Sequence, residues 1–489
     1  MGWLFNCLRN MKVFAKDYRL RSLGVVAIFM FATTGIFSQS SQLWWKIEVV
    51  DSIPGQYTSI VLDSLGNPWI SYYDANNGWL MCAHWTGSLW DIDTVDNGGG
   101  NDVGMYSNIA LDTTGSPHIV YFDNTGNRLK HAWWDGATWQ VEFITDPYSS
   151  DYGYWCDIAI DSLNRIWVSY HDADNLRLMC ARKVGAIWDT IYIVDDPTGS
   201  IVAGEYSSIC IDTANNPHIS YYKTGFGGEL SHAFWDGSTW QTQAVDNVVA
   251  YYTSITSSEW DTLCISYYDS NLQDLKYAKG YFSLGTWNWV AQALDTAGNV
   301  GQWSSIDVYR NSPGISYYDA TNFWLKGAHL EQGAWRIEII DTSGVGEYTS
   351  IALDTNGLPC ISYYDSNNGW LKCARLLIRP QVDSTSPIHN EVNVSQVSEI
   401  NVWFSKDIES ATINGASFKV IGSQSGEKSG TITYNGVERK ATFTLNPNEY
   451  FYIGEKVTVT LTDSIKSTEG APLVPYTFES VSYTHLRAH

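Results

Sequence analysis

Residues 106–146 read YSNIALDTTGSPHIVYFDNTGNRLKHAWWDGATWQVEFITD. Gly, Pro, Asn and Asp interrupt this stretch at regular intervals and divide it into four apolar runs of strand length. Its opening signature is an aromatic residue three positions before an isoleucine that follows Ser, Asn or Asp. The signature recurs, at intervals of 49, 49, 51, 46, 51 and 45 residues, at Tyr57, Tyr106, Trp155, Tyr206, Tyr252, Trp303 and Tyr348. Seven copies of a four-stranded unit predict an all-β fold, a seven-bladed β-propeller.

The last unit lacks its fourth strand. It stops at residues 373–375, whereas the other units continue to a Trp that is followed six or seven residues later by an Asp. Residues 45–51, WKIEVVD, match residues 335–341, WRIEIID, of the sixth unit. We therefore expect the N-terminal strand to complete the last blade and close the propeller, which leaves no open sheet edge.

The composition agrees with many short strands. The chain of 489 residues holds 23 Trp, 31 Tyr and 16 Phe but only 17% charged residues, which excludes a disordered, collagen-like or coiled-coil protein. Its net charge of −23 disfavours nucleic acid and anionic lipid as partners. The cysteines after residue 38 fall inside strand patterns and form no CxxC motif, so we interpret them as core thiols.

The N-terminus has the pattern of an export signal. Four basic residues between positions 12 and 21 precede the apolar run 23–37, which is too short to span a bilayer. We expect cleavage after residue 38 and no transmembrane segment in the remaining chain. Met11 is an alternative start, and residues 481–489 resemble read-through of a sequencing adapter. The expected product is a monomer that is secreted or carried on the surface of a bacterial cell.

Residues 45–378 resemble the BNR or Asp-box repeat propellers of bacterial secreted proteins. The resemblance lies in the repeat architecture, because WDGATW (134–139) and WDGSTW (235–240) only approximate the Asp-box motif and lack one residue between Asp and Gly. It does not imply sialidase activity, since the few arginines of this region share no repeat position. The resemblance implies a propeller domain over residues 39–378.

A second pattern begins near residue 380. The segments SEINVWFSKDI, SFKVI, SGTITYNG, RKATFTLNP and EKVTVTLTDSI alternate apolar and polar residues between Gly, Asn and Ser turns, as strands do. They resemble the bacterial Ig-like domain of the SbsA type. The resemblance implies an Ig-like β-sandwich over residues 379–480 that serves as a spacer or surface module.

Candidate ligand residues gather on one predicted face of the propeller. They are the seven aromatics of the repeat signature, together with the Asp that ends the second strand of six units: Asp74, Asp123, Asp172, Asp269, Asp319 and Asp365. A second Asp set ends the fourth strands: Asp51, Asp96, Asp146, Asp195, Asp246, Asp295 and Asp341. Aromatic faces beside carboxylates suit sugar rings, and carboxylates also suit calcium, the one cofactor that the pattern admits. Seven similar positions favour multivalent glycan binding.

The alternative to ligand binding is a purely structural role for these aspartates and aromatics. An Asp that precedes Asn, Gly or Ser in a hairpin commonly accepts hydrogen bonds from its own turn, and the aromatics can simply pack between blades. The Asp of the turn after the first strand in five units is assigned to turn chemistry: Asp63, Asp112, Asp161, Asp212 and Asp354.

Departures from the repeat mark other candidates. Lys223 stands where the other units have the second-strand Asp, and His171 precedes Asp172, so these three residues could form a proton-transfer group or a surface salt bridge. His118 and His218, both in PHI segments, are interpreted as turn or packing residues rather than metal ligands. Near-identical repeats disfavour catalysis, which needs residues in different environments.

The sequence thus predicts an exported binding protein whose partner is a carbohydrate or an extracellular protein. An extracellular polysaccharide hydrolase or lyase is the alternative, and a purely structural surface module is the third reading. No catalytic residue is assigned, because no hydrolase, nucleotide-binding or zinc motif is present in the sequence.

Overall fold

The computed structural model describes residues 42–225 and 227–482. The predicted export signal and most of the predicted adapter tail lie outside these residues. The described chain is all-β, with no α-helix and two short 3-10 helices, η1 (Gly98–Gly100) and η2 (Ser410–Thr412). Neither of these helices, the two found among the described residues, has the length or the hydropathy of a membrane-spanning helix.

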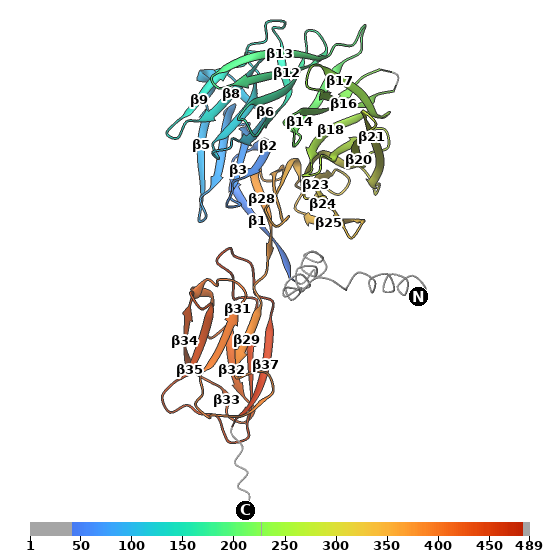
Figure 1. Cartoon of the computed structure of the whole chain (residues 1–489). Coiled ribbons are helices and arrows are strands. Elements are labelled where there is room, and N and C mark those ends of the chain that lie inside the picture. Colours follow the sequence, from blue (N-terminus) through green and yellow to red (C-terminus); the bar gives the residue numbers. More distant parts are fainter. Residues whose placement is uncertain (1–41, 226, 483–489) are drawn as a thin grey trace, which may run out of the picture. The chain divides into compact units, whose positions relative to one another are not determined.

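Residues 43–378 form seven four-stranded sheets, an arrangement consistent with a β-propeller (Figure 1). Sheets 1 to 3 consist of β2 (Gly55–Leu62), β3 (Pro68–Asp74), β4 (Trp79–Trp85), β5 (Trp90–Asp96); β6 (Val103–Leu111), β7 (Pro117–Asp123), β8 (Arg128–Trp134), β9 (Trp139–Phe143); and β10 (Tyr152–Ile160), β11 (Ile166–Asp172), β12 (Arg177–Val184), β13 (Ile187–Asp195). Sheets 4 and 5 consist of β14 (Ala203–Ile211), β15 (Pro217–Lys223), β16 (Glu229–Trp235), β17 (Trp240–Asp246); and β18 (Ala250–Ser257), β19 (Leu263–Asp269), β20 (Asp274–Ser283), β21 (Thr286–Asp295). Sheets 6 and 7 consist of β22 (Val300–Tyr309), β23 (Ser312–Asp319), β24 (Trp324–Glu331), β25 (Ala334–Asp341); and β26 (Glu347–Leu353), β27 (Pro359–Asp365), β28 (Trp370–Ile378), β1 (Leu43–Asp51).

Sheet 7 joins the two ends of this region, as the sequence predicted. Its strand order is β1-β28-β27-β26, so the N-terminal strand supplies the fourth strand of the last sheet. Arg375 on β28 donates a hydrogen bond from Nη2 to Oε2 of Glu48 on β1 at 3.0 Å. The match between residues 45–51 and 335–341 was therefore a correct guide to this pairing.

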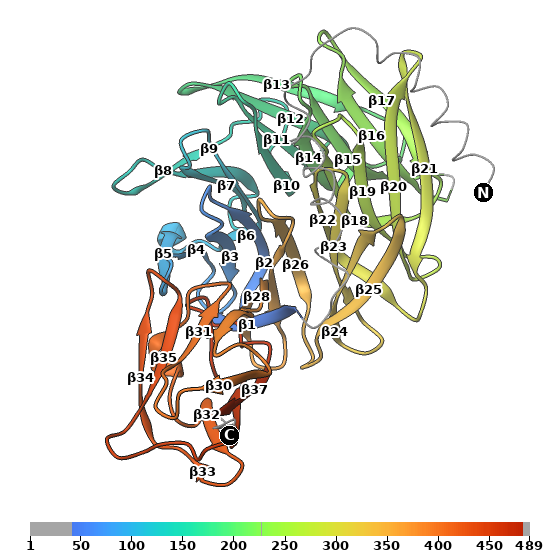
Figure 2. The ribbon, with the colours of Figure 1, turned by 60° about the horizontal axis from the view of Figure 1, so that its bottom comes forward.

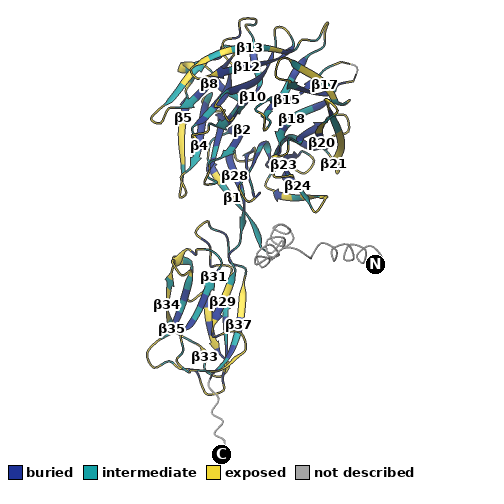
Figure 3. Cartoon of the chain, in the orientation of Figure 1, coloured by how far each residue is buried: buried dark blue, intermediate teal, exposed yellow. Residues whose placement is uncertain are grey.

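The second strand is the most buried strand of each sheet, and the fourth strand is the most exposed (Figure 3). Second strands such as β3 and β11 are buried almost throughout, whereas fourth strands such as β5 expose most of their residues. The first strands of successive sheets contact each other in the order β2, β6, β10, β14, β18, β22, β26 and again β2 (Figure 2). The seven cysteines in the described residues are free, and six of them are buried, which confirms the interpretation as core thiols.

Glycine sets the distance between neighbouring sheets. Gly104 and Gly301 lie two residues before a signature aromatic, with φ of +113° and +105°. A Cβ atom at Gly301 would lie 2.7 Å from the Cα of Leu275, and one at Gly104 would lie 2.9 Å from the Cα of Leu80. Any side chain here would push the first strand away from the third strand of the preceding sheet.

A buried tyrosine and an aspartate form a clamp between each pair of neighbouring sheets. The hydroxyl of a second-strand Tyr donates to a carboxylate at 2.6–2.9 Å, and this carboxylate ends the fourth strand of the preceding sheet or, in the case of Asp146, lies three residues beyond it. The pairs are Tyr72–Asp51, Tyr121–Asp96, Tyr170–Asp146, Tyr221–Asp195, Tyr267–Asp246, Tyr317–Asp295 and Tyr363–Asp341. Five of these carboxylates also pair with a lysine: Lys130, Lys223, Lys276, Lys326 or Lys372.

The lysine changes the electrostatics of a clamp. Burial would raise the pKa of Asp96, Asp295 and Asp341, but hydrogen bonds from the lysine and tyrosine outweigh it and lower the pKa. The pKa of Asp146, to which no lysine donates in the described chain, is raised by burial. The fourth-strand aspartates are thus explained by contacts between sheets.

A second inter-sheet contact involves the residue two positions after each signature aromatic. Ser350 Oγ accepts a hydrogen bond from Ile60 N at 3.2 Å, and serine does the same in most sheets. In sheet 3 this residue is Asp157, whose carboxylate accepts from Ile209 N at 2.8 Å. Burial raises the pKa of Asp157 to about 6.

The remaining strands form two further sheets with the orders β29-β31-β35-β34 and β30-β37-β36-β32-β33. Alternate residues such as Val402, Phe404, Phe418 and Phe478 are buried between them in one core. The strands are β29 (Val382–Ser386), β30 (Glu391–Val394), β31 (Ile400–Phe404), β32 (Phe418–Gly422), β33 (Gly426–Glu427), β34 (Gly430–Asn435), β35 (Lys440–Leu445), β36 (Lys456–Leu461) and β37 (Tyr476–Ser482).

The clamp between sheets 7 and 1 can be tested with Tyr72→Phe. This change leaves the ring in place but removes the 2.6 Å hydrogen bond to Asp51, so a partly buried carboxylate loses its donor. We expect the free energy of unfolding to fall by about 2 kcal/mol in urea denaturation. Tyr281→Phe, at an exposed position near the end of β20, is the control and should have little effect. Equal effects of the two changes would contradict the clamp.

The buried carboxyl of Asp157 predicts a pH dependence of stability. Because its pKa is raised to about 6 in the folded protein and lies near 3.9 when unfolded, its ionisation destabilises the fold progressively as pH rises from about 4 to about 6. Asp157→Ser, which installs the residue of most other sheets, should therefore stabilise the protein by about 2 kcal/mol at neutral pH and by much less near pH 4. Denaturation at the two pH values checks this, and a gain that is the same at both would refute it.

Candidate functional site

The seven signature aromatics occupy bulges in the first strands. The pairing of first and second strands shifts register at each of them, and all seven have φ between 49° and 54°. A bulge redirects a side chain, and a positive φ is costly for a bulky residue. Strained backbone of this kind is concentrated at functional sites in proteins.

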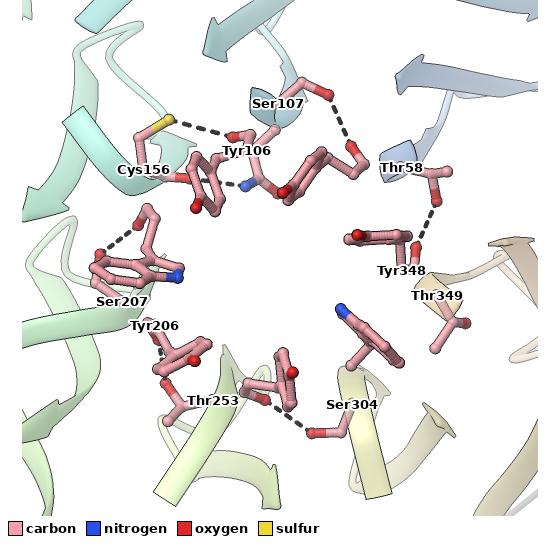
Figure 4. Close-up of a pocket in the computed structure, with 15 residues that line it drawn as sticks. Thr58, Tyr106, Ser107, Cys156, Tyr206, Ser207, Thr253, Ser304, Tyr348 and Thr349 are labelled. Carbon is pink, nitrogen blue, oxygen red and sulfur yellow. Dashed lines mark hydrogen bonds between the residues drawn. The ribbon is translucent and has the colours of Figure 1, made fainter. Parts of the chain in front are cut away.

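The bulges bring the aromatic rings together around one opening (Figure 4). Neighbouring ring centroids are 4.6–5.8 Å apart all the way round, including 4.6 Å between Tyr57 of sheet 1 and Tyr348 of sheet 7. The rings and the polar residues that follow them line a cavity of about 160 Å³, which we call the aromatic funnel. The seven aromatics thus line one shared cavity, whereas the sequence analysis expected several equivalent sites at these residues.

Hydroxyl groups fix the backbone of the funnel. In six of the seven sheets the residue after the aromatic donates a hydrogen bond to the carbonyl of the aromatic in the preceding sheet, as Ser107 does to Tyr57 O at 2.9 Å (Figure 4). Thr58 donates to Tyr348 O at 2.8 Å, which carries the contact from sheet 7 to sheet 1. Cys156 makes the same contact through Sγ at 3.3 Å. These bonds hold the strained residues in place.

The funnel lining is uncharged. Its residues are Tyr, Trp, Ser, Thr, Asn and Cys. Burial raises the pKa of the funnel tyrosines, to about 12 for Tyr252, so their hydroxyls stay protonated and can donate at neutral pH. Such a surface offers aromatic faces for CH groups and hydroxyls for polar groups.

The second-strand aspartates do not line the funnel. All six are almost completely buried, and each accepts hydrogen bonds from the turn that follows it. Asp319, for example, accepts from Thr321 N and Asn322 N at 3.0 Å. The geometry therefore favours the turn role that the sequence analysis held as the alternative for Asp74, Asp123, Asp172, Asp269, Asp319 and Asp365.

The residues around Lys223 have separate partners. His171 Nδ1 lies 2.8 Å from Ala203 O, Lys223 donates to Asp195 at 2.8 Å, and Arg177 donates to Asp172 at 2.9 Å. The hydrogen bonds of the described residues therefore do not join His171, Asp172 and Lys223 into one proton-transfer group.

Two carboxyl groups beside the funnel were not predicted. Glu205 and Glu347 directly precede the funnel residues Tyr206 and Tyr348, and burial raises the pKa of both. The charge of Glu347 also helps to raise the pKa of Tyr252, on another sheet. The signal in the sequence was the tripeptide Gly-Glu-Tyr, present in two of the seven units.

Comparison with known proteins gives a family for the C-terminal part. Residues 378–484 match the family model described as a bacterial Ig-like domain. No curated protein matches the chain in sequence.

Several solved structures are similar to this chain at low identity. They include BP39L lectin from Burkholderia pseudomallei (14% identity, TM-score 0.49, 68% of this chain and 98% of that one) and an ulvan lyase of polysaccharide lyase family PL25 (12%, 0.45, 68% and 92%). A mutant Aleuria aurantia lectin in complex with Fucα1-6GlcNAc is also similar (14%, 0.39, 59% and 96%). Similarity at this level carries no argument about function, which must come from the geometry of the site.

The buried aspartates predict insensitivity to chelators. Because the carboxylate of Asp319 already accepts three turn hydrogen bonds, EDTA should leave the melting temperature unchanged. Asp319→Ala should lower the free energy of unfolding by about 2 kcal/mol, since it leaves the buried turn donors without an acceptor. A melting temperature that falls with EDTA and recovers with calcium would assign these residues to a metal instead.

Proposed function

We propose that this chain is an exported or cell-surface carbohydrate-binding protein. In this proposal the seven sheets are the blades of one propeller over residues 39–378, and an Ig-like domain over residues 379–480 spaces it from its point of attachment. The observation that carries the proposal is the closed ring of seven aromatics around an uncharged funnel. Stacked CH faces and hydroxyl donors are the contacts that bind sugar rings.

The size of the funnel limits what enters it. A cavity of about 160 Å³ is close to the volume that holds one benzene-sized ring and below the usual range for ligand pockets. We therefore expect one terminal sugar residue of a glycan to enter, while the rest of the glycan stays on the open face. The stoichiometry should be one glycan per chain at this site.

A glycan-array screen of the full chain, followed by calorimetry on the best glycan, tests this proposal. Trp303→Ala opens the ring at one position and should weaken binding about tenfold, which corresponds to about 1.4 kcal/mol. The exposed Trp260, outside the funnel, provides the matched control Trp260→Ala, which should bind like the unchanged protein. A blank array would contradict glycan recognition for the structures printed and favour a protein partner.

A polysaccharide hydrolase or lyase is the second candidate, and Glu205 and Glu347 are the observation that favours it. A carboxyl group with a raised pKa is the usual general acid in glycoside hydrolysis. If this candidate holds, Glu205→Gln or Glu347→Gln should abolish release of new chain ends from a polysaccharide but leave binding intact. Binding without any release of chain ends would leave the binding protein as the better description.

A further inference from the structure

A second and larger cavity lies between sheets 2 and 3, away from the funnel residues. It has a volume of about 560 Å³, within the usual range for small-molecule sites. Its polar lining comes from Asp112, His118, Glu142, Asn164 and Lys183. Trp133, Ile160 and Ile166 supply apolar surface. We call it the sheet 2–3 cavity.

A chain of hydrogen bonds runs along one wall of this cavity. Glu142 Oε1 lies 2.9 Å from His131 Nδ1, and His131 Nε2 lies 3.0 Å from His118 Nδ1. Lys183 Nζ and Trp188 Nε1 also donate to Glu142 Oε1. Burial would raise the pKa of Glu142, but its hydrogen bonds with His131, Lys183 and Trp188 lower the pKa to about 2, so this carboxylate is ionised.

The ionised carboxylate fixes the direction of every bond in the chain. A carboxylate can only accept, so His131 donates from Nδ1 and its Nε2 must be an acceptor. His118 then donates from Nδ1 to His131, and the Nε2 of His118 carries a lone pair. This nitrogen lies 3.9 Å from Oδ2 of Asp112, another acceptor. Two acceptors therefore face each other without a hydrogen between them.

Sheet 4 provides an internal comparison. His218 Nδ1 lies 3.1 Å from His232 Nε2, as in sheet 2, but Gln243 occupies the place of Glu142 opposite His232. The Gln243 amide donates to Trp287 O, and His232 Nδ1 has no hydrogen-bond partner in the described chain. No acceptor therefore fixes the proton of His232 on Nδ1. His232 can carry its proton on Nε2 and donate to His218 Nδ1, so that His218 can donate from Nε2 to Asp212 at 3.4 Å.

Glu142 therefore distinguishes two otherwise similar groups. Where glutamine replaces it, the Asp–His contact is 3.4 Å long and can be made by the protein alone. Where glutamate is present, the contact opens to 3.9 Å and lacks a proton. The other Asp112 oxygen, Oδ1, accepts from Thr114 N and Ser116 N in the turn, so Oδ2 is the oxygen left for a ligand.

The gap between His118 Nε2 and Asp112 Oδ2 requires a ligand group that donates a hydrogen bond to each of these two acceptors. One hydroxyl has a single hydrogen and cannot donate to both acceptors, whereas an ammonium group has several. Two carboxylates and one lysine, with both histidines neutral, give the lining a formal charge of −1, which favours a cation. Because burial lowers the pKa of His118 to about 4, this side chain remains a neutral acceptor at ordinary pH and is too weak a base for proton abstraction.

We propose that the sheet 2–3 cavity binds a small molecule through a primary ammonium group, which donates to His118 Nε2 and Asp112 Oδ2. Trp133 and the two isoleucines contact the carbon skeleton of this ligand. Lys183, held by Glu142 and 4.6 Å from the centroid of Trp133, donates to its polar groups at the other end. An amino sugar has this combination of an ammonium group, hydroxyls and CH faces.

The tautomers of His118 and His218 test whether the His118 nitrogen that faces Asp112 lacks a proton. In the full chain with ¹⁵N-labelled histidine, long-range ¹H–¹⁵N spectra should show His118 protonated at Nδ1 and His218 protonated at Nε2. His118→Asn and His218→Asn assign the two signals. A His118 protonated at Nε2 would overturn the proposal, because the gap to Asp112 would then already hold a proton.

A matched pair of ligands tests whether the sheet 2–3 cavity recognises an ammonium group. At about pH 6, where an amine beside a ring is protonated, calorimetry should detect D-glucosamine but not D-glucose. Glu142→Gln copies sheet 4, releases the tautomer of His118 and should weaken binding at least tenfold. Gln243→Glu in sheet 4 is the control and should leave glucosamine binding unchanged. Melting curves of both variants check that they fold.

Equal binding of glucose and glucosamine would overturn the ammonium assignment. So would an unchanged affinity in Glu142→Gln, or no binding at all, in which case water fills the gap. The funnel is tested separately by Trp303→Ala, which should not alter glucosamine binding at the sheet 2–3 cavity. Failure of one proposal is thus distinguishable from failure of the other.

Discussion

The hydrogen bond from a buried tyrosine to a carboxylate of the neighbouring sheet is the contact on which this architecture depends. The seven sheets are separate strand ladders, and the main chain links neighbouring sheets by isolated hydrogen bonds near the turns, such as Val103 N to Gly78 O. Apolar packing between sheets is strong but has no direction. The Tyr–Asp clamp adds direction, because a buried carboxylate is destabilising unless a donor reaches it. Each sheet is therefore held at one angle to the next. Seven such contacts together determine the shape of the aromatic funnel.

The sequence was sufficient to predict much of this fold. The repeat signature located the first strands, and the match of residues 45–51 to residues 335–341 located the strand that joins sheets 7 and 1. These features were visible because each depends on a local pattern of turns and apolar residues. The bulges were not visible, since Tyr57 and its equivalents look like ordinary strand residues until the register shift of each strand pair is known. The pattern indicated that these aromatics share a face, but not that they share one cavity.

The roles of the two sets of aspartates could not be predicted from the sequence around each of them. Both sets end a strand before a turn, and nothing nearby separates Asp319, which caps its own turn, from Asp295, which joins two sheets. The difference lies in Tyr317, whose hydroxyl reaches Asp295 only when the strands are assembled. The histidines beside the sheet 2–3 cavity depend even more clearly on residues that are distant in the sequence. The two PHI segments are alike, and the properties of His118 and His218 diverge because Glu142 and Gln243, more than twenty residues further along the chain, fix or release a proton.

The pairing of β1 with β28 also constrains how the protein folds. Glu48 and Arg375 are 327 residues apart, so this contact closes a very long loop. The entropy of that closure is least unfavourable once the intervening sheets have already folded, because they shorten the path between the two strands. Sheet 7 should then be the last to form, and until it does both β1 and β28 expose unpaired main-chain groups. A chain that emerges N-terminus first must keep its first strand unpaired until nearly 380 residues have been made. Assembly of the ring is therefore a late, all-or-none event rather than a gradual winding of one sheet onto the next.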